Sequence, residues 1–130
     1  MMMTTLALAG CVNFEMTPDT AGGMPTLNVC QTYAAAKAGN ASKASGVTAA
    51  QELARRPDFT VQEVKLIAKG IAAPGMSEAA GLCAWGGYWN DVNVTTTGSG
   101  SVKQYVFGDG QYIKRRYLYA KNGRVISTQE

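Results

Sequence analysis

The chain has 130 residues, of which 46% are hydrophobic, and its formal charge is +3. This length allows one domain with tails, no apolar run approaches the roughly 20 residues that cross a bilayer, and the charge is too small to indicate a nucleic-acid partner by itself. The sequence contains no histidine, which removes the commonest general base and a common zinc ligand.

The first eleven residues end in the letters LAGC, at positions 8–11. This order resembles the lipobox of bacterial diacylated lipoproteins, whose signal is cleaved just before the cysteine. The resemblance implies that residues 1–11 form a signal segment and that the thiol of Cys11 receives the lipid. The alternative is a frayed apolar N-terminus without a processing role.

Residues 12–26 contain two prolines and two glycines. Such a composition is typical of a flexible tether. A lipoprotein needs a tether between its lipid and its folded part, so we expect one folded domain over residues 27–130.

Four helices are expected next, because apolar residues recur at helical spacing between recognisable start and stop residues. They fall within residues 27–39, 47–56, 60–71 and 73–87. Thr48 is a candidate N-cap of the second helix, after a linker over residues 40–46. Thr60 and Glu63 form a predicted capping box at the third, and Ser77 is the expected N-cap of the fourth.

Two cysteines lie in these helices, Cys30 in the first and Cys83 in the fourth, on their expected inner faces. If Cys11 carries a lipid, they remain as an even pair, and we predict a disulfide between them. The alternative is that all three cysteines are reduced and that Cys30 and Cys83 are small core residues.

After residue 90 the pattern changes from helix to strand. The expected strands lie within residues 91–97, 102–108, 112–120 and 124–129. Asn122-Gly123 between the last two is a strong signal for a tight hairpin turn, because both positions require positive φ. Helices followed by a meander predict an α+β fold, with N-terminal helices packed on one face of a three- to four-stranded antiparallel β-meander.

The segments GMSEAAGLCAWG, VNVTTTGSGSVKQYVFG and RYLYAKNGRVISTQ, in this order and spacing, resemble small lipoproteins of proteobacteria and their phages. The same layout is similar to the SmpA/OmlA family, which includes the small lipoprotein of the outer-membrane barrel-assembly machine. The resemblance implies helices followed by an antiparallel sheet, and an outer-membrane location on the periplasmic face through an N-terminal lipid.

Sequence signatures of catalysis are missing. The carboxylates are scattered without the spacing of a metal site, and Cys30 and Cys83 are not in a CxxC arrangement. No GxSxG motif, phosphate-binding loop or dinucleotide fingerprint occurs. We therefore expect no enzyme, no cofactor and no metal, and a nucleic-acid partner is not expected for a lipid-anchored protein.

A basic and aromatic strand is the first candidate for partner binding. On a strand over residues 112–120, Lys114 and Arg116 share one face, and Tyr117 and Tyr119 share the other. The basic face would suit an anionic partner, lipid head groups or peptidoglycan. The alternative is that the tyrosines cover the helices while the charges keep a sheet face soluble.

A second candidate is the aromatic cluster of Trp85, Tyr88 and Trp89 around two glycines. Aromatic side chains beside a turn can anchor a protein partner. The alternative is that Trp85 belongs to the core and that the glycines end the helix.

These features together predict a non-catalytic envelope lipoprotein that binds a protein or another envelope component, as an accessory of outer-membrane assembly or stability. The alternative function is an inhibitor, or a phage superinfection-exclusion lipoprotein, that blocks an envelope enzyme or channel.

Overall fold

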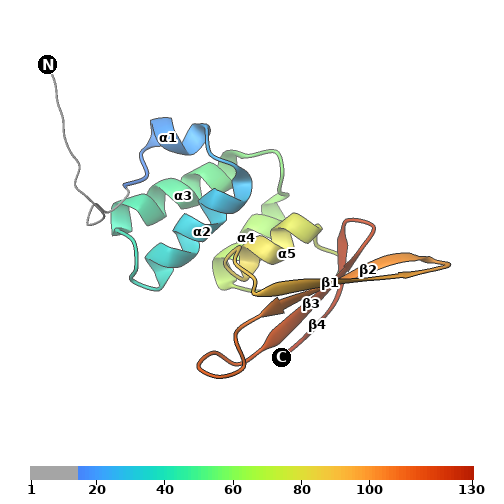
Figure 1. Ribbon diagram of the computed structural model, residues 1–130. Helices are drawn as coiled ribbons and strands as arrows, with labels where there is room; N and C mark the ends of the chain where they lie inside the picture. The colour runs from blue at the N-terminus through green and yellow to red at the C-terminus, as the bar shows by residue number, and fades with distance from the viewer. Residues whose placement is uncertain (1–14) are drawn as a thin grey trace, which may run out of the picture.

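The computed structural model describes residues 15–130, which form a group of helices beside one antiparallel sheet (Figure 1). The helices precede the strands, which confirms the predicted α+β class. The helices are α1 (Pro18–Gly22), α2 (Thr26–Lys37), α3 (Lys43–Arg55), α4 (Val61–Lys69) and α5 (Glu78–Ala84). The strands are β1 (Asp91–Thr97), β2 (Gly100–Phe107), β3 (Arg116–Lys121) and β4 (Arg124–Gln129). Over residues 15–130, no helix combines the length and apolar character that crossing a membrane requires.

The starts of α4 and α5 follow from local sequence, as predicted. The Thr60 hydroxyl accepts the N–H of Glu63, and the Glu63 carboxylate accepts the N–H of Thr60, so the capping box is present. Ser77 caps α5 through the N–H of Ala80. The second oxygen of Glu63 accepts the N–H of Ser77 at 2.7 Å, so one carboxylate joins the starts of both helices.

The start of α3 differs from the expectation. Its N-cap is Ser42 and not Thr48, so the predicted linker is helical over residues 43–46. Within this turn α3 comes very close to α2, because a Cβ added at Gly46 would lie 2.6 Å from the Cβ of Ala36. The Ser42 hydroxyl accepts the N–H of Ser45, so a local cap starts α3 earlier than Thr48, and the added turn packs against α2.

The predicted tether over residues 12–26 is wrong for its described part, residues 15–26. Pro18–Gly22 form α1, which Thr17 caps, and the side chains of Met16 and Ala21 are buried. The N–H of Met16 donates to the hydroxyl of Ser45 in α3 at 2.9 Å. The packed part of the chain therefore begins before residue 27.

Arg56 explains why this segment packs instead of remaining extended. Its guanidinium donates to the carbonyl oxygens of Ala21 and Met24, at 2.8 and 2.6 Å, and to the hydroxyl of Thr26 at 2.8 Å. Glu52 holds the guanidinium from the other side at 2.7 Å. One arginine after α3 thus binds the chain between α1 and α2.

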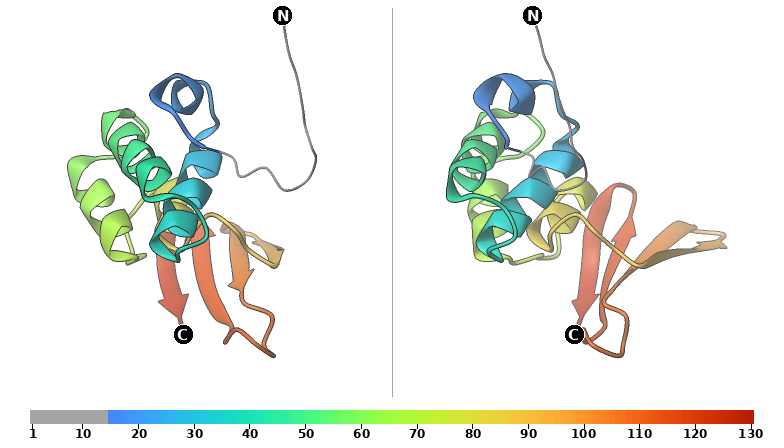
Figure 2. Two further views of the ribbon diagram at one scale, coloured as in Figure 1. Left: turned by 90° about the vertical axis from the view of Figure 1, so that its left-hand side faces the viewer. Right: turned by 60° about the vertical axis from the view of Figure 1, so that its left-hand side comes forward.

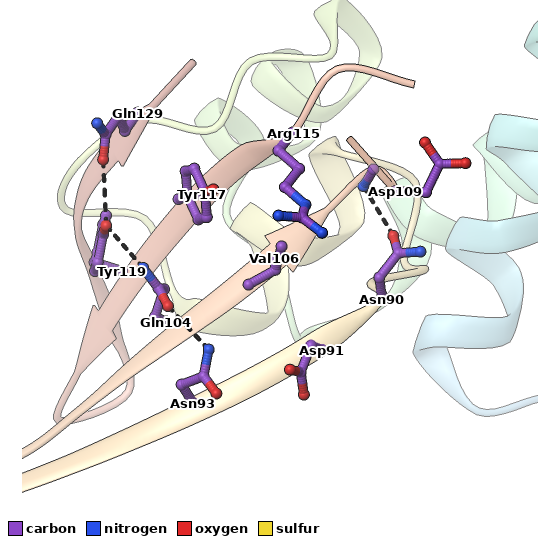
Figure 3. Close-up of a pocket in the computed structure, with 11 residues that line it drawn as sticks. Asn90, Asp91, Asn93, Gln104, Val106, Asp109, Arg115, Tyr117, Tyr119 and Gln129 are labelled. Atoms are coloured by element: carbon purple, nitrogen blue, oxygen red, sulfur yellow. Dashed lines mark hydrogen bonds between the residues drawn. The ribbon is translucent and has the colours of Figure 1, made fainter. Parts of the chain in front are cut away.

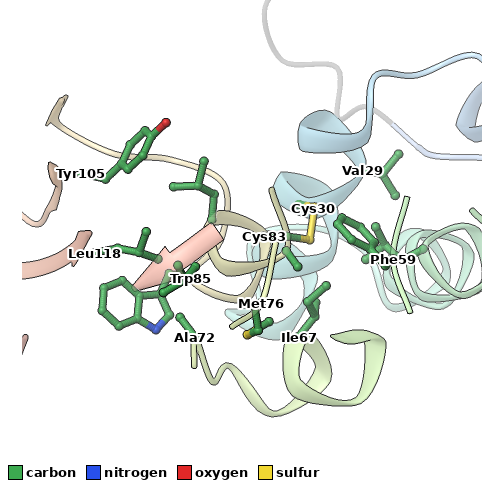
Figure 4. Close-up of a cluster of buried hydrophobic side chains, with 14 of the residues drawn as sticks. Val29, Cys30, Phe59, Ile67, Ala72, Met76, Cys83, Trp85, Tyr105 and Leu118 are labelled. Atoms are coloured by element: carbon green, nitrogen blue, oxygen red, sulfur yellow. A yellow bond between two sulfur atoms is a disulfide. The ribbon is translucent and has the colours of Figure 1, made fainter. Parts of the chain in front are cut away.

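A disulfide between Cys30 of α2 and Cys83 of α5 confirms the predicted pairing, with the two Cα atoms 5.1 Å apart. It lies inside the buried cluster that joins the helices to the sheet (Figure 4). The bond therefore fastens α2 to α5, the helix that contacts β3 and β4.

The sheet is a meander with the strand order β1-β2-β3-β4 and antiparallel pairing throughout. The bounds of β1 and β4 agree with the prediction. Asn122 and Gly123 connect β3 to β4 with φ of 53° and 76°, the conformation that the tight-turn signal predicts. The predicted strand over residues 112–120 is shorter than expected, because β3 begins only at Arg116.

The helices lie on one side of the sheet, and the β1–β2 hairpin extends beyond them (Figure 2). Contact between α5 and the sheet is close: a Cβ added at Gly81 would lie 2.6 Å from a methyl group of Val125. At the start of α5, the Tyr105 hydroxyl and the Lys103 ammonium both donate to the carboxylate of Glu78. Burial and this carboxylate together raise the pKa of Tyr105.

Candidate functional site

The two faces of the sheet have opposite characters. The face toward the helices is apolar at its centre, and its buried side chains are Tyr105, Phe107, Leu118, Ala120 and Val125. Because side chains alternate along a strand, the residues between them point to the other side. This second side, which we call the open face, is the part of the sheet that the helices leave uncovered (Figure 2).

A row of hydrogen-bonded side chains crosses the open face from β1 to β4 (Figure 3). The Asn93 amide donates to the Gln104 carbonyl oxygen at 3.0 Å, and the Gln104 amide donates to the Tyr119 hydroxyl at 3.0 Å. The Tyr119 hydroxyl donates to Gln129 at 3.3 Å. Each strand contributes one member, so we call these four side chains the polar row. Their mutual bonds link the side chains of all four strands into one chain of donors and acceptors.

A shallow hollow of about 770 Å³ lies along the polar row. Arg115 and Tyr117 lie beside the row, and Asn90 and Asp91 lie near the start of β1 (Figure 3). The walls therefore combine amide groups, which both donate and accept, with two tyrosine rings, one cation and two carboxylates. Such a surface offers many polar contacts, as a docking site for a polar partner requires.

The loop between β2 and β3 positions Arg115. Asp109 accepts three backbone N–H groups, those of Gln111, Tyr112 and Ile113, at 2.8–2.9 Å. The bonds from Ile113 and Gln111 contribute most to holding the pKa of Asp109 below its ordinary value, so this carboxylate is charged at neutral pH. The Arg115 side chain lies against Gly110, where an added Cβ would be 3.0 Å from its Nε.

The predicted basic face of Lys114 and Arg116 does not exist. Lys114 lies in the loop before β3 and is exposed. Arg116 is the first residue of β3 and points toward the helices, where its guanidinium lies 4.2 Å from the centre of the Trp85 ring. Tyr117 and Tyr119 belong to the open face and do not cover the helices. The reason is the loop at Asp109. Because this loop continues to residue 115, β3 begins only at Arg116, and Lys114 does not share a strand face with it.

The predicted aromatic cluster is also divided. Trp85 is buried and meets Phe107 edge to face at 5.2 Å, so its alternative assignment to the core is confirmed. Trp89 is half-buried and meets Tyr105 edge to face at 5.1 Å. Tyr88 remains 70% exposed and lies over a different hollow, beside α2. These three residues therefore do not form one binding surface.

The sequence predicted that Tyr117 and Tyr119 share one face of a strand, but it did not predict the amide members of the polar row. Their signal is a single amide side chain in each of three strands, at Asn93, Gln104 and Gln129, and it becomes visible only once the register brings these strands together. Within the described residues 15–130, no group of three or more histidine, cysteine, aspartate or glutamate side chains could hold a metal ion. Cys11 and the rest of the predicted signal segment lie outside the described residues.

Comparison with known proteins gives no relative: no family model, no curated protein and no solved structure matches this chain. Functional inference therefore depends on the open face and on the sequence features.

Proposed function

We propose that this protein is a non-catalytic envelope lipoprotein that binds a protein or another envelope component through the open face of its sheet. The observation that carries the proposal is the polar row, because it presents ordered donors and acceptors from all four strands on the face that the helices leave uncovered. A binding role fits the two carboxylates near the polar row, because each already accepts a backbone N–H group. Asp109 is engaged by its own loop, and Asp91 accepts the N–H of Val92 at 2.8 Å.

The envelope location is supported by the cysteines. Disulfides persist in oxidising compartments such as the bacterial periplasm, and the Cys30–Cys83 bond is buried. This pairing leaves Cys11 for the lipid that the LAGC motif predicts. We infer an anchor at Cys11 on the periplasmic face of the outer membrane, and a role as an accessory of outer-membrane assembly or stability.

The lipid is tested by mass spectrometry of protein purified from membranes. We expect a mature N-terminus at Cys11 with an acylated mass, and loss of that mass together with loss of membrane association in the Cys11→Ala variant. An intact Met1 without an acyl mass would contradict the anchor.

The binding surface is tested by affinity capture from detergent extracts of the envelope and by sedimentation with isolated peptidoglycan. The variants are Tyr117→Ala, on the open face, and Tyr112→Ala, a control tyrosine that is 85% exposed in the neighbouring loop. We expect Tyr117→Ala to lose recovery of the partner and Tyr112→Ala to retain it. Equal recovery by both variants would contradict the proposal, and recovery of a single enzyme or channel would indicate an inhibitory role.

A further inference from the structure

The two edge strands of the sheet, β1 and β4, differ in their contacts with the rest of the chain. Along β4, the backbone of Val125 exchanges hydrogen bonds with residues 75–76: Gly75 donates to its carbonyl oxygen, and its own N–H donates to Met76, both at 2.8 Å. Ser77 adds a bridge to Arg124. The start of the β4 edge, at Arg124 and Val125, is thus covered by the chain that leads into α5.

Within residues 15–130, the edge at β1 has no such cover. All seven residues of β1 are exposed, and the hairpin that it forms with β2 extends away from the helices (Figures 1 and 2). Val92 and Val94 are 40% and 59% exposed, although both are apolar. The outer side of this strand is therefore open to another chain.

The register determines which backbone groups point outward. Residues 98–99 form a two-residue loop, and the strands close at the pair Thr97–Gly100. In such a hairpin the closing pair is hydrogen-bonded, and alternate pairs follow the same pattern. Val92, Val94 and Thr96 therefore direct their N–H and C=O groups away from β2. The carboxylate of Asp91 accepts one of these donors, the N–H of Val92.

The sequence of β1 lacks the usual protection of an edge strand. Proteins block free edges with lysine, proline, bulges or very short strands. β1 is seven residues long, has an uninterrupted register with β2, and contains no proline or basic residue. Its only charge is Asp91, at the end of the strand. A strand with these properties is a template for strand addition.

We propose that β1 pairs antiparallel with β1 of a second copy of this chain, with the two-fold axis at Val94, so that two sheets join into one of eight strands. This register overlaps all seven residues. It places the Val94 side chains opposite each other and each Val92 opposite a Thr96, which covers apolar surface that is exposed in one copy. It places Asp91 opposite Thr97, so no like charges meet.

A second copy suits this edge because the strand complements itself in both pattern and charge. On the open face the same register sets Asn93 opposite Thr95, so the polar rows of two copies become neighbours in one continuous surface. The pairing uses the outward backbone groups of β1 and not the open-face side chains, so this inference is independent of the proposed function.

The contact is small. Two seven-residue strands bury less than the roughly 1,200–2,000 Å² of a standard interface, so we expect a weak, reversible dimer with a dissociation constant of about 10–300 μM. Sedimentation equilibrium of the full 130-residue chain with its disulfide intact, at concentrations up to about 1 mM, covers this range.

The test uses opposite charges at the proposed axis. Val94→Lys and Val94→Glu each place like charges opposite each other, so we expect each variant alone to dimerise at least about tenfold more weakly. An equal mixture of the two should restore dimers. Thr95→Lys is the matched control: it adds the same charge to the next residue, whose backbone faces β2, and should change the constant by no more than about twofold.

Three results would overturn the proposal: a wild-type chain that stays monomeric to about 1 mM, a Val94→Lys variant that dimerises like the wild type, or a mixture that fails to restore dimers. Circular dichroism establishes that each variant is folded. If Val94→Lys does not fold, Thr96→Lys takes its place, because Thr96 also faces outward and would meet Val92 of the second copy. A wild type that binds extended peptides but not itself counts against the proposal.

Discussion

The two faces of the sheet share one backbone but differ in burial and polarity. Leu118 and Tyr119 are neighbours on β3, yet Leu118 is completely buried against the helices while Tyr119 lies in the polar row. Side chains alternate along a strand, so one residue step moves a side chain from the core to the surface. The covered side chains therefore stabilise the fold, whereas the binding that we propose would depend on the side chains of the open face.

The largest expected effect is on the covered face. Leu118→Ala should lower the free energy of unfolding by about 2–5 kcal/mol, because it leaves a cavity between α5 and the sheet. Tyr119→Ala, one residue away, should lower it by no more than about 1 kcal/mol, since one of the hydrogen bonds lost is exposed and the other is only part-buried. Urea denaturation followed by circular dichroism measures both. Equal losses of unfolding free energy at the two positions would contradict the distinction between the covered face and the open face.

Removal of the disulfide should give the next largest loss of unfolding free energy. The double variant Cys30→Ala/Cys83→Ala should lose about 2–4 kcal/mol, because the bond closes a separation of 53 residues and restricts the unfolded chain. Denaturation with and without reductant measures this. The wild type should become less stable on reduction and the double variant should not respond. A wild type indifferent to reductant would show that the bond adds nothing to the attachment of the helices.

Packing between α5 and the sheet gives a smaller effect. Gly81→Ala should cost about 1–3 kcal/mol, because the new methyl group would overlap Val125 and approach Leu118. Gly98→Ala, in the exposed β1–β2 turn, is the control, since an added Cβ there meets nothing within 4 Å. Thermal unfolding of both variants measures the difference in stability between them. A neutral Gly81→Ala would mean that the two layers separate easily.

The smallest expected effect concerns acid. Burial opposes the charge of Glu63, but the N–H groups of Ser77 and Thr60 outweigh it and hold the pKa of Glu63 below its ordinary value of 4.5. The unfolded state therefore binds more protons in this range, so the contribution is complete above pH 4.5 and is lost as the pH falls through the lower folded pKa.

Glu63→Gln should flatten the dependence of unfolding on pH below 4.5, as measured by denaturation at a series of pH values. Glu130→Gln, at the exposed C-terminus, is the control and should retain the slope of the wild type. An unchanged slope in Glu63→Gln would contradict the role of this carboxylate.

Local chemistry made much of the fold predictable. The capping box at Thr60, the N-cap at Ser77 and the turn at Asn122-Gly123 depend on residues that are close in sequence, and all three are confirmed. The disulfide followed from an even pair on two inner helix faces, and it is also confirmed.

Features that depend on distant contacts were not predictable. The segment over residues 15–26 packs because Arg56, about thirty residues later, binds its carbonyl oxygens. Arg116 faces Trp85 because the loop at Asp109 sets where β3 begins. The polar row requires the register of four strands, so no single segment of the sequence predicts it.

We propose that the open face binds a partner and that its side chains contribute little to the stability of the fold. Recovery of envelope components by the double variant Gln104→Ala/Tyr117→Ala, relative to the wild type at equal concentrations of folded protein, tests it most directly. We expect recovery to be lost while the midpoint of thermal unfolding stays near that of the wild type. Unchanged recovery with the polar row broken would contradict it.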